Sequence, residues 1–261
     1  MREPSGITLA LENLKLGYKE RTLYEGVNLE FRPQALTAII GRNGCGKSTL
    51  LRSLSAIDTP LEGQVMIGSE GSFRPLHSLG GNERARLVSF VSTERLVLSN
   101  LKVESVVGFG LAPYTDIFGR MKPEHHDIVK QSLDMVGMGC FATKSIDTLS
   151  DGERQRVMIA RALAQQTPII ILDEPTAFLD LPNKYEISGL LSDLAHKMHK
   201  TVIFTTHDLD AALELCDRFV VIENGDFVEG SPLEVVRGGC IERMLGSSTK
   251  YLGRRYEELL G

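Results

Sequence analysis

Apolar and polar positions along the chain follow two patterns that predict strands. Positions 7–11 and 27–31 alternate between apolar residues and polar or small ones, which is typical of strands with one buried face. Short apolar runs at 36–40, 169–172 and 202–204 predict further strands, of the kind that is buried on both faces in a parallel sheet.

Apolar residues at helical spacing follow several of these runs. Leu50, Leu51 and Leu54 predict a helix after the first run, and the segment 183–198 carries its apolar residues on one side. An Asn-Gly turn between the apolar segments of 219–228 predicts a hairpin. Strands that alternate with helices predict an α/β fold in which helices cover a parallel sheet.

The stretch from about residue 82 to residue 166 has a different pattern. Its middle is rich in glycine and proline, and Val129, Leu133 and Val136 then place apolar side chains on one face of a helix. We therefore expect a mainly helical insertion at 82–166. The core around this insertion is then formed by two segments, 1–81 and 167–261.

Composition places the chain among ordinary globular proteins. Hydrophobic residues make up 42% of it, charged residues make up 24%, and the formal net charge is -5. A mildly acidic chain is a poor match to a phosphate backbone, so we expect no nucleic acid partner. No apolar run approaches the ~18 residues that span a bilayer, so the chain is expected in the cytoplasm and a membrane role requires partner subunits.

The strongest chemical signal is a glycine-rich loop between the apolar run 36–40 and the helix that follows it. Its glycines allow several backbone N–H groups to point at one anion, and the N-terminus of the next helix adds positive potential. The loop matches the pattern GxxxxGK[ST] and predicts a site for nucleotide phosphates. Its residues are Gly41, Arg42, Asn43, Gly44, Cys45, Gly46, Lys47, Ser48 and Thr49.

Three residues of this loop have side chains with a specific expected role. Lys47 reaches the β- and γ-phosphates, and the Ser48 hydroxyl can bind Mg²⁺. Cys45 has two interpretations, because a thiol near a helix N-terminus can be reactive, whereas a small side chain can simply fit the loop.

An acidic pair, Asp173 and Glu174, follows the apolar run 169–172. Ligands of open α/β folds bind at the carboxyl ends of the strands, where this pair is expected. Asp173 would hold Mg²⁺, and Glu174 would orient or deprotonate the attacking water. Carboxylates at a strand end can also be merely solvated, but the phosphate loop favours the catalytic interpretation.

The segment 149–155 reads Leu-Ser-Asp-Gly-Glu-Arg-Gln. Ser150 and Glu153 form the S-x-x-E pattern of a capping box, and a capped helix N-terminus is also an anion site. The segment is similar to the LSGGQ signature of ABC ATPases, although Asp151 and Glu153 replace a glycine and a glutamine. That resemblance implies a head-to-tail dimer, in which Ser150, Gly152 and Glu153 of one subunit cover ATP held by the other.

Further segments resemble the same family. Tyr18 lies where the family has an aromatic residue that stacks on adenine, but it can also be a strand residue packed on the sheet. The segment 176–180 looks like the aspartate loop that touches the opposite subunit, whereas Asp180 can also cap a helix or form a turn. His207 looks like the switch histidine that holds Glu174 and the water in line, and Asp208 after it would cap a helix.

One position departs from the family. A glutamine that contacts Mg²⁺ and the water usually follows the strand that is expected here at 87–91. Thr93 occupies that place in this chain, with Ser92 or Glu94 as possible substitutes. A threonine hydroxyl can reach a metal through water, so the expected metal-binding residues are Ser48, Asp173 and Thr93.

The resemblance to ABC-transporter ATPases covers about residues 7–230 and keeps the family's order of motifs. The chain looks most like the iron-siderophore, haem and cobalamin uptake group. The resemblance implies a P-loop NTPase with a RecA-like core, an N-terminal antiparallel β subdomain and an inserted helical subdomain. It also implies ATP and Mg²⁺ as cofactors, with Lys47, Glu174 and His207 as catalytic residues.

The implied partners are a second ATPase subunit, integral membrane permease subunits and, indirectly, a substrate-binding protein. The implied place is the cytoplasmic face of the membrane. Three alternatives remain open at this point. They are the ATPase subunit of an exporter, a soluble ABC ATPase without a transport role, and a module that binds nucleotide without hydrolysing it.

Overall fold

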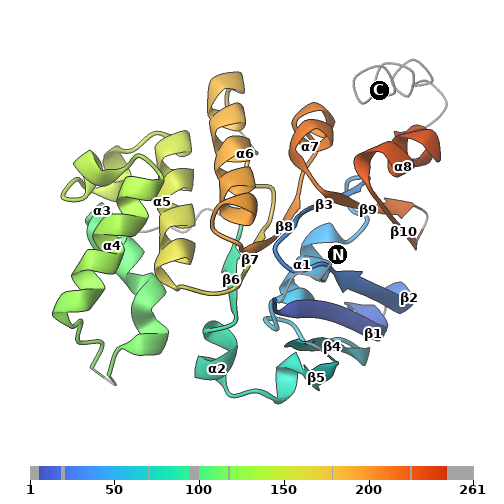
Figure 1. The fold of residues 1–261 in the computed structure, drawn as a ribbon, viewed down its shortest axis with the longest axis horizontal. Coiled ribbons are helices and arrows are strands. Elements are labelled where there is room, and N and C mark those ends of the chain that lie inside the picture. The colour runs from blue at the N-terminus through green and yellow to red at the C-terminus, as the bar shows by residue number, and fades with distance from the viewer. Residues whose placement is uncertain are drawn as a thin grey trace.

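The computed structural model describes most of the 261 residues. The described ranges are 6–18, 21–69, 71–93, 100–116, 118–177, 179–223 and 225–245. Two sheets and a group of helices make up the fold, with α6 and α7 above the larger sheet and α3, α4 and α5 to one side (Figure 1).

The smaller sheet is antiparallel and has the strand order β2-β1-β4-β5. Its strands are β1 (Thr8–Tyr18), β2 (Arg21–Phe31), β4 (Glu62–Ser69) and β5 (Ser72–Pro75). The alternation at 7–11 and 27–31 is confirmed, because Leu9, Leu11 and Phe31 are buried on the sheet's inner face. The expected N-terminal antiparallel subdomain is therefore present.

The larger sheet has the strand order β10-β9-β3-β8-β7-β6. Its strands are β3 (Leu36–Gly41), β6 (Val88–Val91), β7 (Ile169–Leu172), β8 (Thr201–Thr205), β9 (Arg218–Glu223) and β10 (Asp226–Gly230). All neighbouring strands are parallel except β9 and β10, which form the predicted hairpin.

Both faces of the larger sheet are covered, which explains its continuous apolar runs. In β7, Ile170 and Leu172 join one hydrophobic cluster, whereas Ile169 and Ile171 join the other. The second cluster also contains the inward residues of β1 and β2, so it fills the space between the two sheets. The helices that belong to this core are α1 (Lys47–Leu54), α6 (Leu181–His196), α7 (Leu209–Leu215), α8 (Pro232–Arg237) and α9 (Cys240–Leu245).

The segment expected as an insertion is mainly helical, with one exception. Strand β6 lies within 82–166 but pairs with β7 in the larger sheet, so the expected boundary at residue 82 falls before a strand of the core. The helices of this segment are α2 (Gly81–Ala85), α3 (Val103–Gly108), α4 (Pro123–Met135) and α5 (Asp151–Ala164). Short 3₁₀ helices lie at Leu76–Ser78, Phe109–Tyr114, Gly139–Phe141 and Ile146–Thr148.

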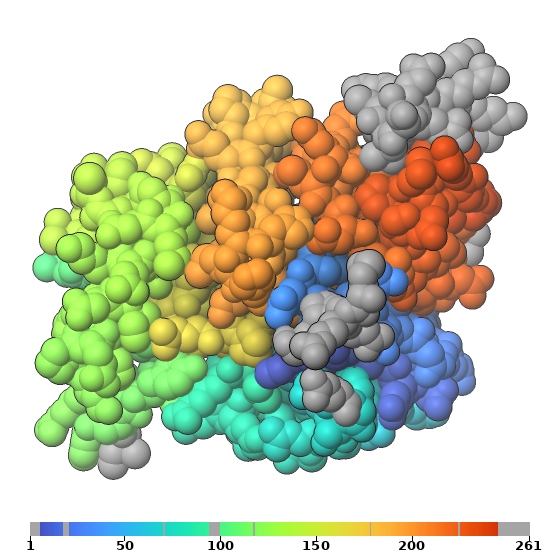
Figure 2. Space-filling view, in the orientation of Figure 1, coloured from blue at the N-terminus to red at the C-terminus, as the bar shows by residue number. Residues whose placement is uncertain are grey.

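Helices α3, α4 and α5 pack on one another and share one apolar cluster. Val129, Leu133 and Val136 are all buried there, as their spacing predicted. The green and yellow atoms of these helices form one side of the molecule, next to the orange atoms of α6 (Figure 2). Within the described residues, no helix has the length and apolar character needed to cross a membrane.

Candidate active site

The glycine-rich loop connects β3 to α1 and holds the Lys47 side chain within itself. Gly44 and Gly46 have φ angles of 74° and 99°, which glycine adopts without strain. Lys47 is 6% exposed, and its ammonium donates hydrogen bonds to the carbonyl oxygens of Gly41, at 2.9 Å, and Arg42, at 3.3 Å. An anion bound by the loop's amides would therefore lie against a positive charge that is already in place.

The acidic pair lies at the carboxyl end of β7, next to the end of β8. The Thr205 hydroxyl donates to Asp173 Oδ1 at 2.7 Å and accepts from the backbone N–H of Glu174 at 2.8 Å. One hydroxyl group thus orients both acidic residues. Asp173 is 6% exposed, and its buried carboxylate presents oxygen atoms, which are the ligands that Mg²⁺ prefers.

Glu174 has a strained backbone and a fixed side chain. Its φ angle of 46° lies in the left-handed region, which a residue with a side chain rarely adopts. Its Oε1 atom lies 2.9 Å from His207 Nε2, within hydrogen-bonding distance. Such backbone strain is common at functional sites, where contacts with the surrounding structure hold the residue in a conformation that is unfavourable in free energy.

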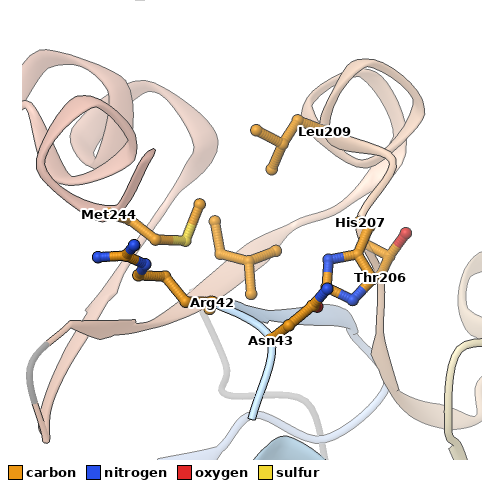
Figure 3. Close-up of a pocket in the computed structure, with 8 residues that line it drawn as sticks. Arg42, Asn43, Thr206, His207, Leu209 and Met244 are labelled. Carbon is orange, nitrogen blue, oxygen red and sulfur yellow. The ribbon is translucent and has the colours of Figure 1, made fainter. Parts of the chain in front are cut away.

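His207 faces the glycine-rich loop across a pocket of about 260 Å³. Figure 3 shows Arg42 of the loop and Met244 of α9 on one side of this pocket, and Asn43 of the loop next to His207 on the other. Asp208 caps α7 by accepting from the N–H of Ala211, as predicted. The loop, Glu174 and His207 therefore meet at one edge of the sheet.

Thr93 lies beside the acidic pair, as its position after β6 predicted. Its hydroxyl donates to the carbonyl oxygen of Asp173 at 2.7 Å. This bond ties the ends of β6 and β7 together, and a metal-binding role of Thr93 stays a prediction. Glu94 lies outside the described residues. Tyr18 ends β1, and its side chain also lies outside the described part, so its contact with adenine stays a prediction.

The predicted capping box at the start of α5 is confirmed. Ser150 Oγ accepts from the N–H of Glu153, and Glu153 Oε2 accepts from the N–H and hydroxyl of Ser150. These bonds from the Ser150 hydroxyl and N–H lower the pKa of Glu153, so the carboxylate is charged at neutral pH. Asp180 likewise caps α6 by accepting from the N–H of Asn183.

Gly152 is constrained by the neighbouring helix α6. A Cβ atom at this position would lie 3.1 Å from the side chain of Asn183, so the close approach of α5 and α6 favours glycine. The start of α5 lies on the other side of α6 from the glycine-rich loop and α1 (Figure 1). One copy of the chain therefore does not bring Ser150, Gly152 and Glu153 to its own phosphate loop.

Comparison with known proteins decides the family. The family model described as ABC transporter matches residues 24–177. The chain belongs to this family. The ABC transporter ATPase is also 36% identical to the ferric enterobactin transport ATP-binding protein FepC of Escherichia coli, over 90% of this chain and 86% of that protein.

Two solved structures have the same fold. A metal-chelate type ABC transporter in an inward-facing conformation has a TM-score of 0.80 and 27% identity, with 92% of this chain and 89% of that chain covered. A dimeric post-hydrolysis state of the ATP-binding cassette MJ0796, bound to ADP and Pi, has a TM-score of 0.71 and 28% identity, with 86% and 98% covered. The expected fold class and ATP hydrolase activity are thus confirmed.

Two residues of the ABC transporter ATPase site were missed from the sequence. Thr205, which orients both acidic residues, ends a buried strand two positions before His207, and a polar residue there was the available signal. Tyr24 lies under the glycine-rich loop, where its hydroxyl would be 2.9 Å from a Cβ atom at Gly46. Its place inside a half-buried strand gave no signal, because aromatic residues are common there.

Proposed function

We propose that two copies of this ABC transporter ATPase hydrolyse Mg·ATP at shared sites and thereby drive the import of a metal chelate, namely an iron-siderophore, haem or cobalamin, through a membrane permease. The observation that carries the proposal is the hydrogen bond between Glu174 Oε1 and His207 Nε2, at 2.9 Å, beside the loop that holds Lys47. In this proposal Glu174 is the general base and His207 is the group that orients it, next to the γ-phosphate of a nucleotide on the loop.

The residues present fit Mg²⁺. Ser48 lies in the first turn of α1, the buried Asp173 carboxylate is oriented by the Thr205 hydroxyl, and the Thr93 hydroxyl lies next to Asp173. All three offer oxygen atoms to a hard cation. When bound, Mg²⁺ neutralises charge on the phosphate oxygens and fixes their position.

The chain's own residues then perform the hydrolysis. Lys47 exchanges its hydrogen bonds to the loop carbonyls for bonds to the phosphates and balances their negative charge. Glu174 accepts a hydrogen bond from the attacking water and orients it or takes its proton. His207 holds the Glu174 carboxylate in that position and offers a second contact to the γ-phosphate.

A second copy completes each site in this proposal. Ser150, Gly152 and Glu153 begin a capped helix that lies away from the chain's own loop, which a head-to-tail dimer explains. The dimeric state of the related cassette MJ0796 supports this arrangement. The helical part of the segment 82–166, which excludes strand β6, would pass the closure to permease subunits at the cytoplasmic face of the membrane.

The cargo is proposed from the relatives. FepC is a ferric enterobactin transport protein, and the transporter with the TM-score of 0.80 is of metal-chelate type. We infer that this chain serves the same class of cargo, which a substrate-binding protein would deliver to the permease. Siderophore, haem and cobalamin chelates are the candidates within this class.

Substitution of the general base tests the active site. We expect Glu174→Gln to retain ATP binding and to reduce phosphate release in steady state by about 100-fold or more, because general base catalysis contributes on that order. Glu214→Gln, the same change at an exposed position on α7, is the matched control and should leave the rate unchanged. Normal hydrolysis by the Glu174 variant would refute the assigned role.

Uptake by cells tests the cargo. Cells that lack this chain should lose the uptake of a labelled ferric siderophore, haem or cobalamin, and the wild-type chain should restore it whereas Glu174→Gln should not. Affinity purification of the tagged chain should recover a permease in the same cells. If uptake of all three cargoes persists and no permease is recovered, the importer proposal is wrong even though the ATPase assignment stands.

A further inference from the structure

A second pocket, of about 320 Å³, borders the glycine-rich loop and has a thiol and a phenol in its wall. Cys45 supplies the thiol and is partly exposed. Tyr24 is 3% exposed, and among the described residues its hydroxyl has no hydrogen-bond partner. That hydroxyl points at the loop, because a Cβ atom at Gly46 would lie 2.9 Å from it. The pocket therefore leads to a cysteine beside a buried hydroxyl group that lacks a partner.

Tyr24 is held in place and remains a donor. Its ring packs against Phe227 edge to face, with the ring centroids 4.9 Å apart. Burial raises the pKa of Tyr24, and negative charge on Cys45 raises it further. The phenol consequently keeps its proton at neutral pH, and a thiolate at Cys45 would give it the acceptor that it lacks.

The rim of this pocket is mainly positive. Arg21 from the start of β2, Arg42 from the loop and Arg243 from α9 all line it. Glu223 is the acidic residue in this lining, and it is paired with Arg243 through Nε at 3.0 and 3.1 Å. Arg21 and Arg42 thus give the entrance a net positive charge, which attracts anions and raises their local concentration.

We propose that Cys45 is a site of thiol–disulfide exchange for an anionic disulfide of low molecular weight, which enters through this pocket. The Cys45 thiol releases its proton to solvent, and the thiolate attacks one sulfur of the disulfide. A bond forms between Cys45 Sγ and that sulfur, the original disulfide bond breaks, and the other half leaves as a thiolate that takes up a proton. Cys45 is oxidised and the leaving half is reduced, so no further oxidant is required.

The adduct prevents nucleotide binding because it is attached within the loop that binds the phosphates. A Cβ atom at Gly41 would lie 2.8 Å from Cys45 Sγ and 3.1 Å from the side chain of Ile222. Cys45 Sγ thus packs close to Gly41, whose carbonyl oxygen holds Lys47, and a group added to the sulfur through the pocket disturbs the loop where the phosphates bind. An excess of small thiol reverses the exchange and restores the loop. This consequence for ATP hydrolysis rests on the proposed function, whereas formation of the adduct does not.

Two methanethiosulfonate reagents of opposite charge test the proposal on the full chain. Mass spectrometry follows the rates at Cys45 and at Cys140, which is exposed and serves as the internal reference. Relative to Cys140, we expect Cys45 to prefer the anionic reagent by about tenfold, because a charged cleft concentrates ions of opposite sign. Mg·ATP should slow the reaction at Cys45 but not at Cys140. Equal preference at the two cysteines would overturn the proposal.

Variants separate the contributions of the pocket. Arg21→Gln should reduce the preference for the anionic reagent without changing the untreated ATPase rate. Tyr24→Phe should slow the reaction of both reagents with Cys45, because it removes the hydroxyl that donates a hydrogen bond to the thiolate. Cys140→Ser should leave both the adduct at Cys45 and the loss of ATPase intact. Full modification of Cys45 with unchanged ATP hydrolysis would overturn the proposal. If the untreated chain does not hydrolyse ATP, the proposed function is contradicted instead, and the ratio of labelling at Cys45 to labelling at Cys140 then decides whether Cys45 is the exchange site.

Discussion

At the scale of single residues, the site depends on hydrogen bonds that hold charged groups in position. Thr205 bridges the Asp173 carboxylate and the backbone N–H of Glu174, and His207 holds the Glu174 side chain. Glu174 keeps a left-handed backbone, at φ 46°, between these contacts. The strain persists because the partners on β8 and after it fix both ends of the residue.

Removal of the Thr205 hydroxyl should therefore affect stability and rate together. We expect Thr205→Val to lower the free energy of unfolding by about 1–3 kcal/mol, because the buried Asp173 carboxylate and the Glu174 N–H lose their partner. The turnover number should fall as the acidic pair loses its orientation. Urea unfolding and a phosphate-release assay measure the two effects.

Thr205→Ser is the matched control, since it keeps the hydroxyl and removes only a methyl group. It should retain most of the activity and most of the stability. If Thr205→Val hydrolyses ATP as fast as Thr205→Ser, the hydroxyl does not orient the catalytic pair.

At the scale of elements, helix N-termini are fixed by local sequence. Helices α5 and α8 begin with the same S-x-x-E box, at Ser150–Glu153 and Ser231–Glu234, with both reciprocal hydrogen bonds present in each. The two boxes share their hydrogen bonds but not their surroundings, because α8 lies beside β10 at the end of the larger sheet. Comparing the two caps therefore distinguishes the effect of losing a helix cap from the effect of losing a contact with the nucleotide.

Ser150→Ala and Ser231→Ala form a matched pair. Each should lower the free energy of unfolding by about 1 kcal/mol, the usual cost of a lost N-cap. Only Ser150→Ala should also reduce ATP hydrolysis, because only that cap is proposed to contact the partner's nucleotide. Thermal unfolding and phosphate release measure the two effects, and equal hydrolysis by both variants would show that Ser150 acts as a cap alone.

At the scale of the whole molecule, the two halves of the proposed nucleotide site lie apart on one chain. The phosphate loop and the start of α5 lie on opposite sides of α6 (Figure 1). Two chains in the proposed head-to-tail arrangement would bring the two halves together twice, which would close the assembly at a dimer. The activity of the isolated ATPase should then depend on its concentration.

Dilution provides the corresponding measurement. We expect the turnover per chain to fall as the chain is diluted through the dimer dissociation constant, because a monomer holds only half of the proposed site. Size-exclusion chromatography in Mg·ATP gives the dimer fraction at each concentration. The Glu174→Gln chain should remain dimeric at lower protein concentrations than the wild-type chain. A turnover per chain that stays constant while chromatography shows only monomers would refute the shared site.

The motifs predicted much of the fold and the site because they depend on neighbours in sequence. The turns at Gly44 and Gly46, the caps at Ser150 and Asp208, and the buried run of β7 all follow from short-range geometry and periodicity. The boundary at residue 82 was placed too early, because pairing of β6 with β7 joins strands that are far apart in the chain. The sequence of a four-residue strand does not indicate which strand it pairs with.

The amino-acid sequence by itself determined the phosphate loop, the acidic pair, the histidine after β8 and the order in which they occur. Only the tertiary structure decided that Thr205 orients both acidic residues, that Thr93 bonds the carbonyl of Asp173, and that Tyr24 and Cys45 line one pocket. The physical reason is that these contacts join residues from strands whose neighbours in the sheet are fixed by packing of the whole core. Local sequence shapes each strand and each turn, but the order of strands brings their side chains together.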